Sequence, residues 1–458
     1  MYRKCIEQLK QWVERIDRGV MVLRGARQVG KTTLVRLLAK EKGLVLIELN
    51  LEDEHSFIGM LDKKSNAKEI LELIMIENGI NESPDNVLFF FDEIQESPGF
   101  YAYLRYFKEV APEYRVVAAG SLLDLEIKNS DSPQGPTGRV EYTYLEPMTY
   151  EEFLIEVNPL AYKKLLTQSL LEPVSEGMHK VYSDLFKSYM VCGGMPAAVK
   201  SFSENQGALR IDEIKTNLFT GYLNDLPKYS GLCGKRYEAK LLQSLLKKIT
   251  GDPTNSMSLS KLAPEVKAAK IRDHIGVLLD ARVIRKTIHS HQNKLPLLSG
   301  ANDKRHKLFA LDVGICYSFM EITPQDVYVQ DDINDIAKGA LAEQYTAQTL
   351  AALPPHYKER ALYHWERDSR GATAEVDFIA GFSGMAVPIE CKSGHSNQMK
   401  SLKLLLQEKP FPIAVRLYAG NITHEEITVD IDNKKFLTRL ISVPHYMLER
   451  LAGNIHTI

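Results

Sequence analysis

The stretch that decides the fold is GVMVLRGARQVGKTTLVRLLAKEKG, residues 19–43. It opens with a short apolar run that predicts a β-strand, and it closes with leucine, valine and alanine at helical spacing. Between them, residues 25–32 satisfy the pattern G-x-x-x-x-G-K-[ST] in full. Glycines let the backbone curl around phosphate oxygens, which then receive amide N–H groups and the positive end of the following helix. The order of strand, loop and helix favours a nucleotide-binding loop over a chance glycine-rich turn.

This loop assigns roles to its residues. Lys31 would reach the β- and γ-phosphates of ATP and assist catalysis, and the Thr32 hydroxyl would hold Mg²⁺. The residues predicted to bind the nucleotide are Gly25, Ala26, Arg27, Gln28, Val29, Gly30, Lys31, Thr32 and Thr33.

Two further strand ends carry polar side chains. NVLFFFDEIQ, residues 86–95, is a continuous apolar strand of the kind found in buried parallel sheets, and it stops at Asp92 and Glu93. Asp92 can bind the magnesium ion, and Glu93 can polarise the attacking water; the plainer alternative is a capped strand end. A third strand, YRVVAAGS, ends at Ser121, which could sense the γ-phosphate or could be ordinary turn chemistry. Together these residues predict an α/β ATPase core.

Composition limits the class of protein. A chain of 458 residues is too long for one core, so two to four domains are expected. The 57 lysines and arginines nearly balance 59 aspartates and glutamates, so any nucleic-acid binding needs a local basic patch. Five scattered cysteines argue against a disulfide framework or a zinc site. With no signal peptide and no apolar run long enough for a membrane, we expect a cytoplasmic protein.

A family resemblance rests on GARQVGKTT, FFFDEIQ, AAGSLLDLE and GRVEYTYLEPMTYEEF. These segments resemble the AAA-type ATPases of a large prokaryotic group whose C-terminal part is called DUF4143. The resemblance implies an ATPase domain over residues 1–150. It also makes Arg139 a candidate transition-state arginine, acting within the chain or across a subunit boundary. The alternative for Arg139 is a surface residue or an ion pair with Glu141.

The middle of the chain is predicted to be helical. Residues 151–230 read as a helical lid, broken at 193–196 because GGMP cannot continue a helix. GGMPAAV resembles a recurring element of the same family. Asp225 matches a family aspartate, and we interpret it as part of a helix C-terminal turn.

Residues 231–325 are predicted to form a winged helix-turn-helix, with three helices followed by a hairpin. The same fold also serves protein contacts, and charge clusters are often solvated faces, so DNA binding here is one of two open interpretations. The basic residues of this region are Lys267, Lys270, Arg272, Arg282, Arg285, Lys286, Lys304, Arg305 and Lys307.

The C-terminal residues 326–458 are predicted to follow the order helix, three strands, helix, strand. Side chains alternate along strands, so carboxylates of EVDF and IECK can face each other if those strands pair. The order resembles the PD-(D/E)xK nuclease fold, which is restriction-endonuclease-like, although Val376 stands where that fingerprint has proline. It implies Glu343, Asp377 and Glu390 as metal ligands, and a nuclease site completed by Glu375 and Lys392. The alternative is a nuclease-like domain that only binds partners.

Three functions remain open. The first is an ATP-hydrolysing switch or motor coupled to the C-terminal domain. The second is a Mg²⁺-dependent DNA nuclease regulated by ATP, which would contact DNA through the winged helix and the C-terminal domain. The third is a scaffold in which nucleotide controls assembly with a protein partner.

Overall fold

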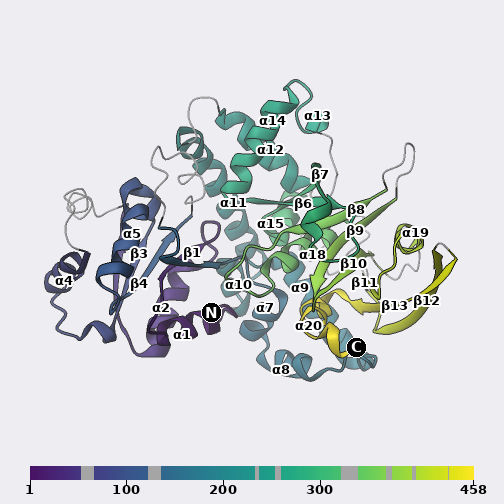
Figure 1. Cartoon of the computed structure of the whole chain (residues 1–458), viewed down its shortest axis with the longest axis horizontal. Helices are drawn as coiled ribbons and strands as arrows, with labels where there is room; N and C mark the ends of the chain where they lie inside the picture. Colours follow the sequence, from purple (N-terminus) through teal and green to yellow (C-terminus); the bar gives the residue numbers. More distant parts are fainter. Residues whose placement is uncertain are drawn as a thin grey trace.

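The computed structural model describes residues 1–52, 67–121, 136–232, 237–252, 259–320, 339–367, 374–392, 394, 399–431 and 433–458. The chain starts with a parallel α/β unit, continues through a group of helices and ends in a second sheet (Figure 1). Residues 122–126 of the family-like segment AAGSLLDLE lie outside the described residues.

The N-terminal unit is built on a parallel sheet of order β2-β3-β4-β1-β5. Its strands are mostly apolar because helices cover both faces. Met21, Leu23 and Phe90 face the side of α1 and α2, whereas Phe89 and Phe91 face α4 and α5. The elements are α1 (Ile6–Glu14), β1 (Val20–Arg24), α2 (Lys31–Lys42), β2 (Val45–Asn50), α4 (Ala67–Glu77), β3 (Val87–Asp92), α5 (Pro98–Val110), β4 (Arg115–Gly120) and β5 (Val140–Tyr144).

The middle helices lie between the two sheets (Figure 1). Gly193 and Gly194 separate α9 from α10, as predicted. They pass so close to other chain segments that a Cβ on Gly194 would lie 2.1 Å from the Met148 carbonyl oxygen. The elements are α7 (Tyr150–Val157), α8 (Pro159–Thr167), α9 (Glu176–Cys192), α10 (Pro196–Ser203) and α11 (Ala208–Leu232).

The region predicted to be a winged helix has the expected element order: α12 (Ala239–Gly251), α13 (Leu259–Leu262), α14 (Ala268–Asp280), β6 (Ile284–Ser290) and β7 (Ala301–Ala310). The hairpin, however, is not a separate wing. β6 pairs in parallel with β8 of the C-terminal region, so β6 and β7 are the edge of the second sheet. The boundary expected near residue 325 therefore does not separate two independent sheets.

The second sheet has eight strands in the order β12-β13-β11-β10-β9-β8-β6-β7. Three strands, a helix and a strand follow α18 as predicted, although residues 333–338 of the predicted helix lie outside the described residues. A further hairpin, β12–β13, was not predicted. The elements are α15 (Val313–Phe319), α18 (Ala340–Ala352), β8 (Leu362–Glu366), β9 (Glu375–Phe382), β10 (Met385–Cys391), α19 (Lys400–Glu408), β11 (Ile413–Tyr418), β12 (Thr423–Ile431), β13 (Lys434–Pro444) and α20 (Leu448–Asn454).

Candidate functional site

The predicted nucleotide-binding loop, which we call the phosphate loop, comprises residues 25–30. It connects β1 to α2 at the carboxyl edge of the first sheet. Gly30 precedes the helix with φ 99°, a conformation that favours glycine. A Cβ on Gly25 would lie 2.3 Å from the Leu145 carbonyl oxygen, so a larger residue would clash with backbone. The loop is therefore built to bring its N–H groups and the N-terminus of α2 to an anion.

Lys31 is held inside this loop. Its Nζ donates hydrogen bonds to the carbonyl oxygens of Gly25 and Ala26, at 3.0 and 2.9 Å. Burial lowers the pKa of the Lys31 ammonium to about 8, although Glu93 and Asp92 oppose the shift. Phosphate oxygens would offer this ammonium stronger acceptors than the two carbonyls.

The predicted magnesium and water-activating residues meet beside the loop. The Thr32 hydroxyl donates to the Asp92 carboxylate at 2.6 Å. The Ser121 hydroxyl donates to the Glu93 carboxylate at 3.3 Å, and Gln95 donates to the same oxygen. Burial raises the pKa of Asp92, while the hydrogen bond from Thr32 lowers it. A hydroxyl and a carboxylate side by side suit a hard cation such as Mg²⁺.

Helix α11 reaches the phosphate loop through a contact that the sequence did not reveal. Asp225 forms an ion pair with Arg27, with 2.7 Å between Oδ2 and Nη1. The Tyr222 hydroxyl donates a hydrogen bond to the Arg27 carbonyl oxygen at 2.7 Å. Our interpretation of Asp225 as a C-terminal turn residue is wrong, because α11 continues to Leu232. The contact joins the helical region to the loop that would hold the phosphates.

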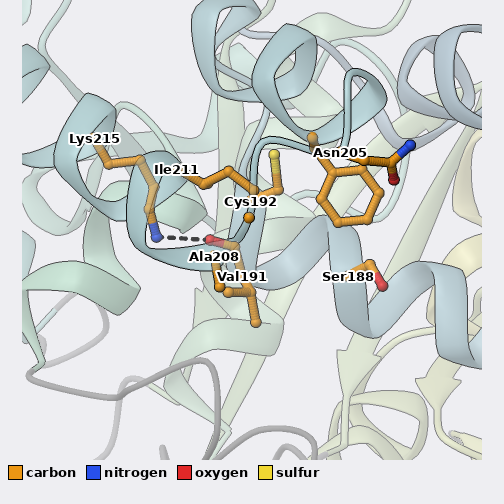
Figure 2. A pocket seen from close by; sticks show the side chains of 9 residues that line it. Ser188, Val191, Cys192, Asn205, Ala208, Ile211 and Lys215 are labelled. Atoms are coloured by element: carbon orange, nitrogen blue, oxygen red, sulfur yellow. Dashed lines mark hydrogen bonds between the residues drawn. The ribbon is translucent and has the colours of Figure 1, made fainter.

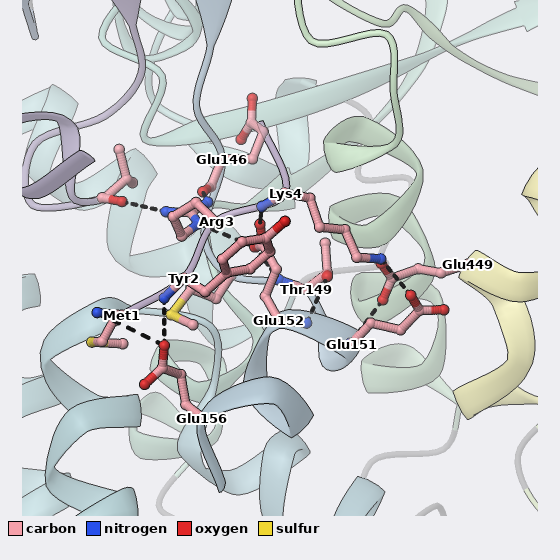
Figure 3. Close-up of polar contacts among 12 residues, drawn as sticks. Met1, Tyr2, Arg3, Lys4, Glu146, Thr149, Glu151, Glu152, Glu156 and Glu449 are labelled. Carbon is pink, nitrogen blue, oxygen red and sulfur yellow. Dashed lines mark hydrogen bonds and ion pairs between the residues drawn. The ribbon is translucent and has the colours of Figure 1, made fainter. Parts of the chain in front are cut away.

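The first residues of the chain tie the loop to α7 (Figure 3). Arg3 donates to the Val29 carbonyl oxygen at 2.7 Å and pairs with Glu152 at 3.1 Å. Glu152 also completes a capping box with Thr149 at the start of α7. The Val29 end of the loop is thus supported by a buried arginine that no local motif indicated.

Lys4 extends this network to the C-terminal helix α20. Its Nζ bonds to Glu151 of α7 and, at 2.7 Å, to Glu449 of α20 (Figure 3). Burial and the charge of Glu449 raise the pKa of Glu151 to about 7. The start of the chain and α7 are therefore joined to the C-terminal helix by ion pairs between the half-buried Lys4 and two buried carboxylates.

Arg139 lies away from the phosphate loop of its own chain. It precedes β5, whose last residue, Tyr144, is in register with Arg24 at the start of the loop. Five strand residues separate the two edges, roughly 16 Å. Its side chain pairs with Glu109 at 2.8 Å, not with Glu141, which pairs with Arg15. A contact with a neighbouring subunit stays a prediction.

Glu375 and Asp377 share one face of β9, as strand alternation predicted, and they meet Glu343 of α18 around a lysine. Ligand oxygens of Glu343, Glu375 and Asp377 lie within 4.8 Å of one another. Lys307 of β7 enters this group and pairs with all three. Burial, with the charge of Asp377, raises the pKa of Glu343 to about 8.

Glu390 and Lys392 flank this group without joining it. They pair with each other at 2.6 Å. Burial and the charge of Asp377 raise the pKa of Glu390 to about 7. Among the described residues, the carboxylates that lie near enough to share one ion are Glu343, Glu375 and Asp377, so this group contains Glu375 where we predicted Glu390 as a metal ligand.

Much of the basic charge that could serve DNA is paired within the chain. The Arg282 guanidinium, besides its ion pair named below, stacks on the Tyr144 ring, 4.9 Å from the ring centroid. Such pairing reduces the positive field available to a polyanion. The pairs are Lys270 with Glu238, Arg282 with Glu359, Arg285 with Glu146, and Lys286 with Asp303.

Two cavities accompany these sites. One of about 640 Å³ lies between β5 and the second sheet, and its lining includes Arg282, Arg285 and Arg360. The other, of about 190 Å³, is mostly apolar and lies between α9 and α11 (Figure 2). Lys215 lines it and donates to the Val191 carbonyl oxygen at 2.8 Å.

Sequence families match three parts of the chain. Residues 17–154 match the family described as an AAA domain. The chain carries an AAA domain. Residues 183–326 and 338–432 match two domains of unknown function, DUF8612 and DUF4143. The prediction of an AAA domain followed by a DUF4143 region is confirmed.

Solved structures resemble the AAA-domain chain only loosely. The Walker-type ATPase PABY2304 of Pyrococcus abyssi is 13% identical, with 69% of this chain and 94% of that one covered and a TM-score of 0.43. The RuvB Holliday junction branch migration motor of Thermotoga maritima is 14% identical, with 63% and 90% covered and a TM-score of 0.30. Scores this low carry no argument about function. No curated protein matches the sequence, and no helix in the described residues is long and apolar enough to cross a membrane.

Proposed function

We propose that this chain is an ATP-hydrolysing switch whose AAA domain controls the position of its C-terminal sheet. The contact that carries the proposal is the 2.6 Å hydrogen bond from Thr32 to Asp92. Thr32 directly follows the loop lysine, and Asp92 directly precedes Glu93. This hydrogen bond sets a hydroxyl and a carboxylate together, where Mg²⁺ would bind and neutralise phosphate charge. Glu93, oriented by Ser121, would accept a proton from the attacking water.

Transmission to the C-terminal half has a physical route. The buried Asp312, directly after β7, accepts a hydrogen bond from the Gly194 N–H at 2.7 Å and from Gln348 of α18 at 3.0 Å. Gly194 belongs to the break before α10, and a Cβ on Gly30 of the phosphate loop would lie 3.5 Å from Pro196. The 193–196 break therefore lies next to the phosphate loop, and through Asp312 it is hydrogen-bonded to the start of the C-terminal half and to α18. A route of contacts becomes a mechanism only when both ends are shown to respond together.

The test combines turnover with hydrogen exchange. Lys31→Ala should abolish ATP turnover, and Glu93→Gln should retain ATP binding while slowing hydrolysis at least ~100-fold, because general-base assistance is lost. The control is Lys304→Met, an exposed position on β7. A non-hydrolysable ATP analogue should change amide exchange in β7 and α18 of the unmodified chain. Full turnover by Lys31→Ala would refute the site, and unchanged exchange would refute the coupling.

A second candidate function is nucleic-acid cleavage by the C-terminal cluster, favoured by the convergence of Glu343, Glu375 and Asp377. With a hard cation bound, such carboxylates could polarise a phosphodiester. Incubation with DNA and RNA substrates in Mg²⁺ or Mn²⁺ tests it. Cleavage unaffected by Asp377→Ala would assign the activity to a contaminant or to another site.

A further inference from the structure

Lys307 occupies the centre of the carboxylate cluster. Its Nζ lies 2.6 Å from a Glu343 oxygen and 3.9 Å from an Asp377 oxygen, and it also bonds to Glu375. The side chain is only 3% exposed. Three elements, α18, β9 and β7, thus supply one ammonium and three carboxylates to a single small volume.

The charges in this volume are unbalanced in a way that favours a cation of higher charge. The Lys307 ammonium faces three carboxylates. Antiparallel pairing of Ile389 with Phe378 sets a fourth carboxylate, Glu390, beside Asp377, and the Oε1 atom of Glu390 is already paired with Lys392 at 2.6 Å. Glu390 is buried, and its Oε2 has no hydrogen-bond partner among the described residues. An unpartnered buried carboxylate oxygen is costly, and a divalent ion takes more oxygen ligands than an ammonium can.

An ordinary structural ion pair explains these contacts less well. Such a pair is usually balanced, because unpaired buried charge is strongly destabilising. On the same strand, Lys304 is exposed, whereas Lys307 is directed into the cluster. The arrangement matches a cation site with a lysine as its occupant.

We propose that the Lys307 ammonium takes the place of a divalent metal ion in the Glu343–Glu375–Asp377 cluster, and that Mg²⁺ or Mn²⁺ binds there only when Lys307 is withdrawn. The inference deepens the second candidate function, since a cluster closed by Lys307 cannot support metal-dependent cleavage. Lys307 is thereby an autoinhibitory residue.

The fold offers a means of withdrawal. Lys307 lies on β7, which ends at Ala310, and Asp312 two residues later is bonded to Gly194. A movement at Gly194 that pulled on Asp312 would be applied to the strand that carries Lys307. In this proposal, nucleotide binding at the AAA domain causes the movement at Gly194.

Mn²⁺ binding to the nucleotide-free full chain, followed by electron paramagnetic resonance of the free ion, tests the proposal. Lys307→Met should gain one site at least ~10-fold tighter than any site in the unmodified chain, because the competing charge is gone. Lys304→Met is the matched control and should gain none. Lys307→Met combined with Asp377→Asn should lose the gained site, which assigns it to this cluster and not to the phosphate loop.

Folding is followed in the same preparations. Lys307→Met leaves carboxylates without their counter-charge, and Mn²⁺ should raise its melting temperature while leaving that of Lys307→Arg unchanged. Equal Mn²⁺ affinity in the unmodified chain and in Lys307→Met would overturn the proposal, as would no gain in Lys307→Met. The measurement contains no nucleotide, so a failure of ATP turnover would refute the ATPase proposal and leave this one standing.

Discussion

Replacing Asp312 by asparagine should destabilise the junction between the middle helices and the C-terminal half. Oδ1 of Asp312 accepts from the N–H groups of Gly314 and Ile315, and Oδ2 accepts from Gly194 N–H and Gln348 Nε2. Asparagine can keep only one oxygen. Its amide nitrogen would then face two donors, and Gln348 cannot turn its own amide without losing its bond from Val313.

The size of the effect follows from these contacts. A hydrogen bond to a charged group contributes about 1.5–3 kcal/mol, so losing the two at Oδ2 costs roughly 3–6 kcal/mol. Burial raises the pKa of Asp312, which means that its charge is itself costly in this position. Removing that charge recovers part of the loss. We therefore expect the free energy of unfolding to fall by about 3 kcal/mol, a large share of the 5–15 kcal/mol typical of a domain.

Urea unfolding followed by circular dichroism measures this loss. The matched control is Asp303→Asn, because the Asp303 side chain is 75% exposed and its carboxylate pairs with Lys286 at 3.2 Å. An exposed pair of this kind contributes about 0.5 kcal/mol. A loss below about 1 kcal/mol in Asp312→Asn would show that the four hydrogen bonds do not hold the junction together.

Two further predictions concern the phosphate loop. Burial lowers the pKa of Lys31 to about 8, and bound phosphates should raise it again. ATP binding at pH 9 should then be accompanied by the uptake of close to one proton. The affinity for ATP should fall roughly tenfold per pH unit between about pH 8 and 10. Calorimetry in buffers of different ionisation enthalpy measures the uptake, which should vanish in Lys31→Arg; a pH-independent affinity in the unmodified chain would contradict the argument. Asp225→Ala removes the partner of Arg27, so α11 should exchange its amides faster without nucleotide, whereas Asp212→Ala, at the far end of α11, should leave residues near Asp225 unchanged. Equal exchange near residue 225 in both variants would show that the ion pair does not hold α11 to the loop.

Local patterns were enough to predict the phosphate loop and its immediate partners. Glycine spacing, the lysine and the hydroxyl of the loop lie within eight residues, and Asp92 directly follows its strand. Because parallel strands end at the same edge of a sheet, recognising the strands placed Asp92 and Ser121 at the edge where the phosphate loop also lies. The same reasoning from strand alternation brought Glu375 and Asp377 to one face.

What the sequence by itself determined is therefore the AAA domain, the order of the elements as far as β11, and the shared face of the two β9 carboxylates. Only the tertiary structure decided which distant residues complete each site: Asp225 against Arg27, Asp312 between Gly194 and α18, and Lys307 among the carboxylates. The physical reason is that each of these contacts joins individual residues of elements that are far apart in the chain. They leave no periodicity or spacing to detect, and they depend on which strand lies at the edge of the second sheet.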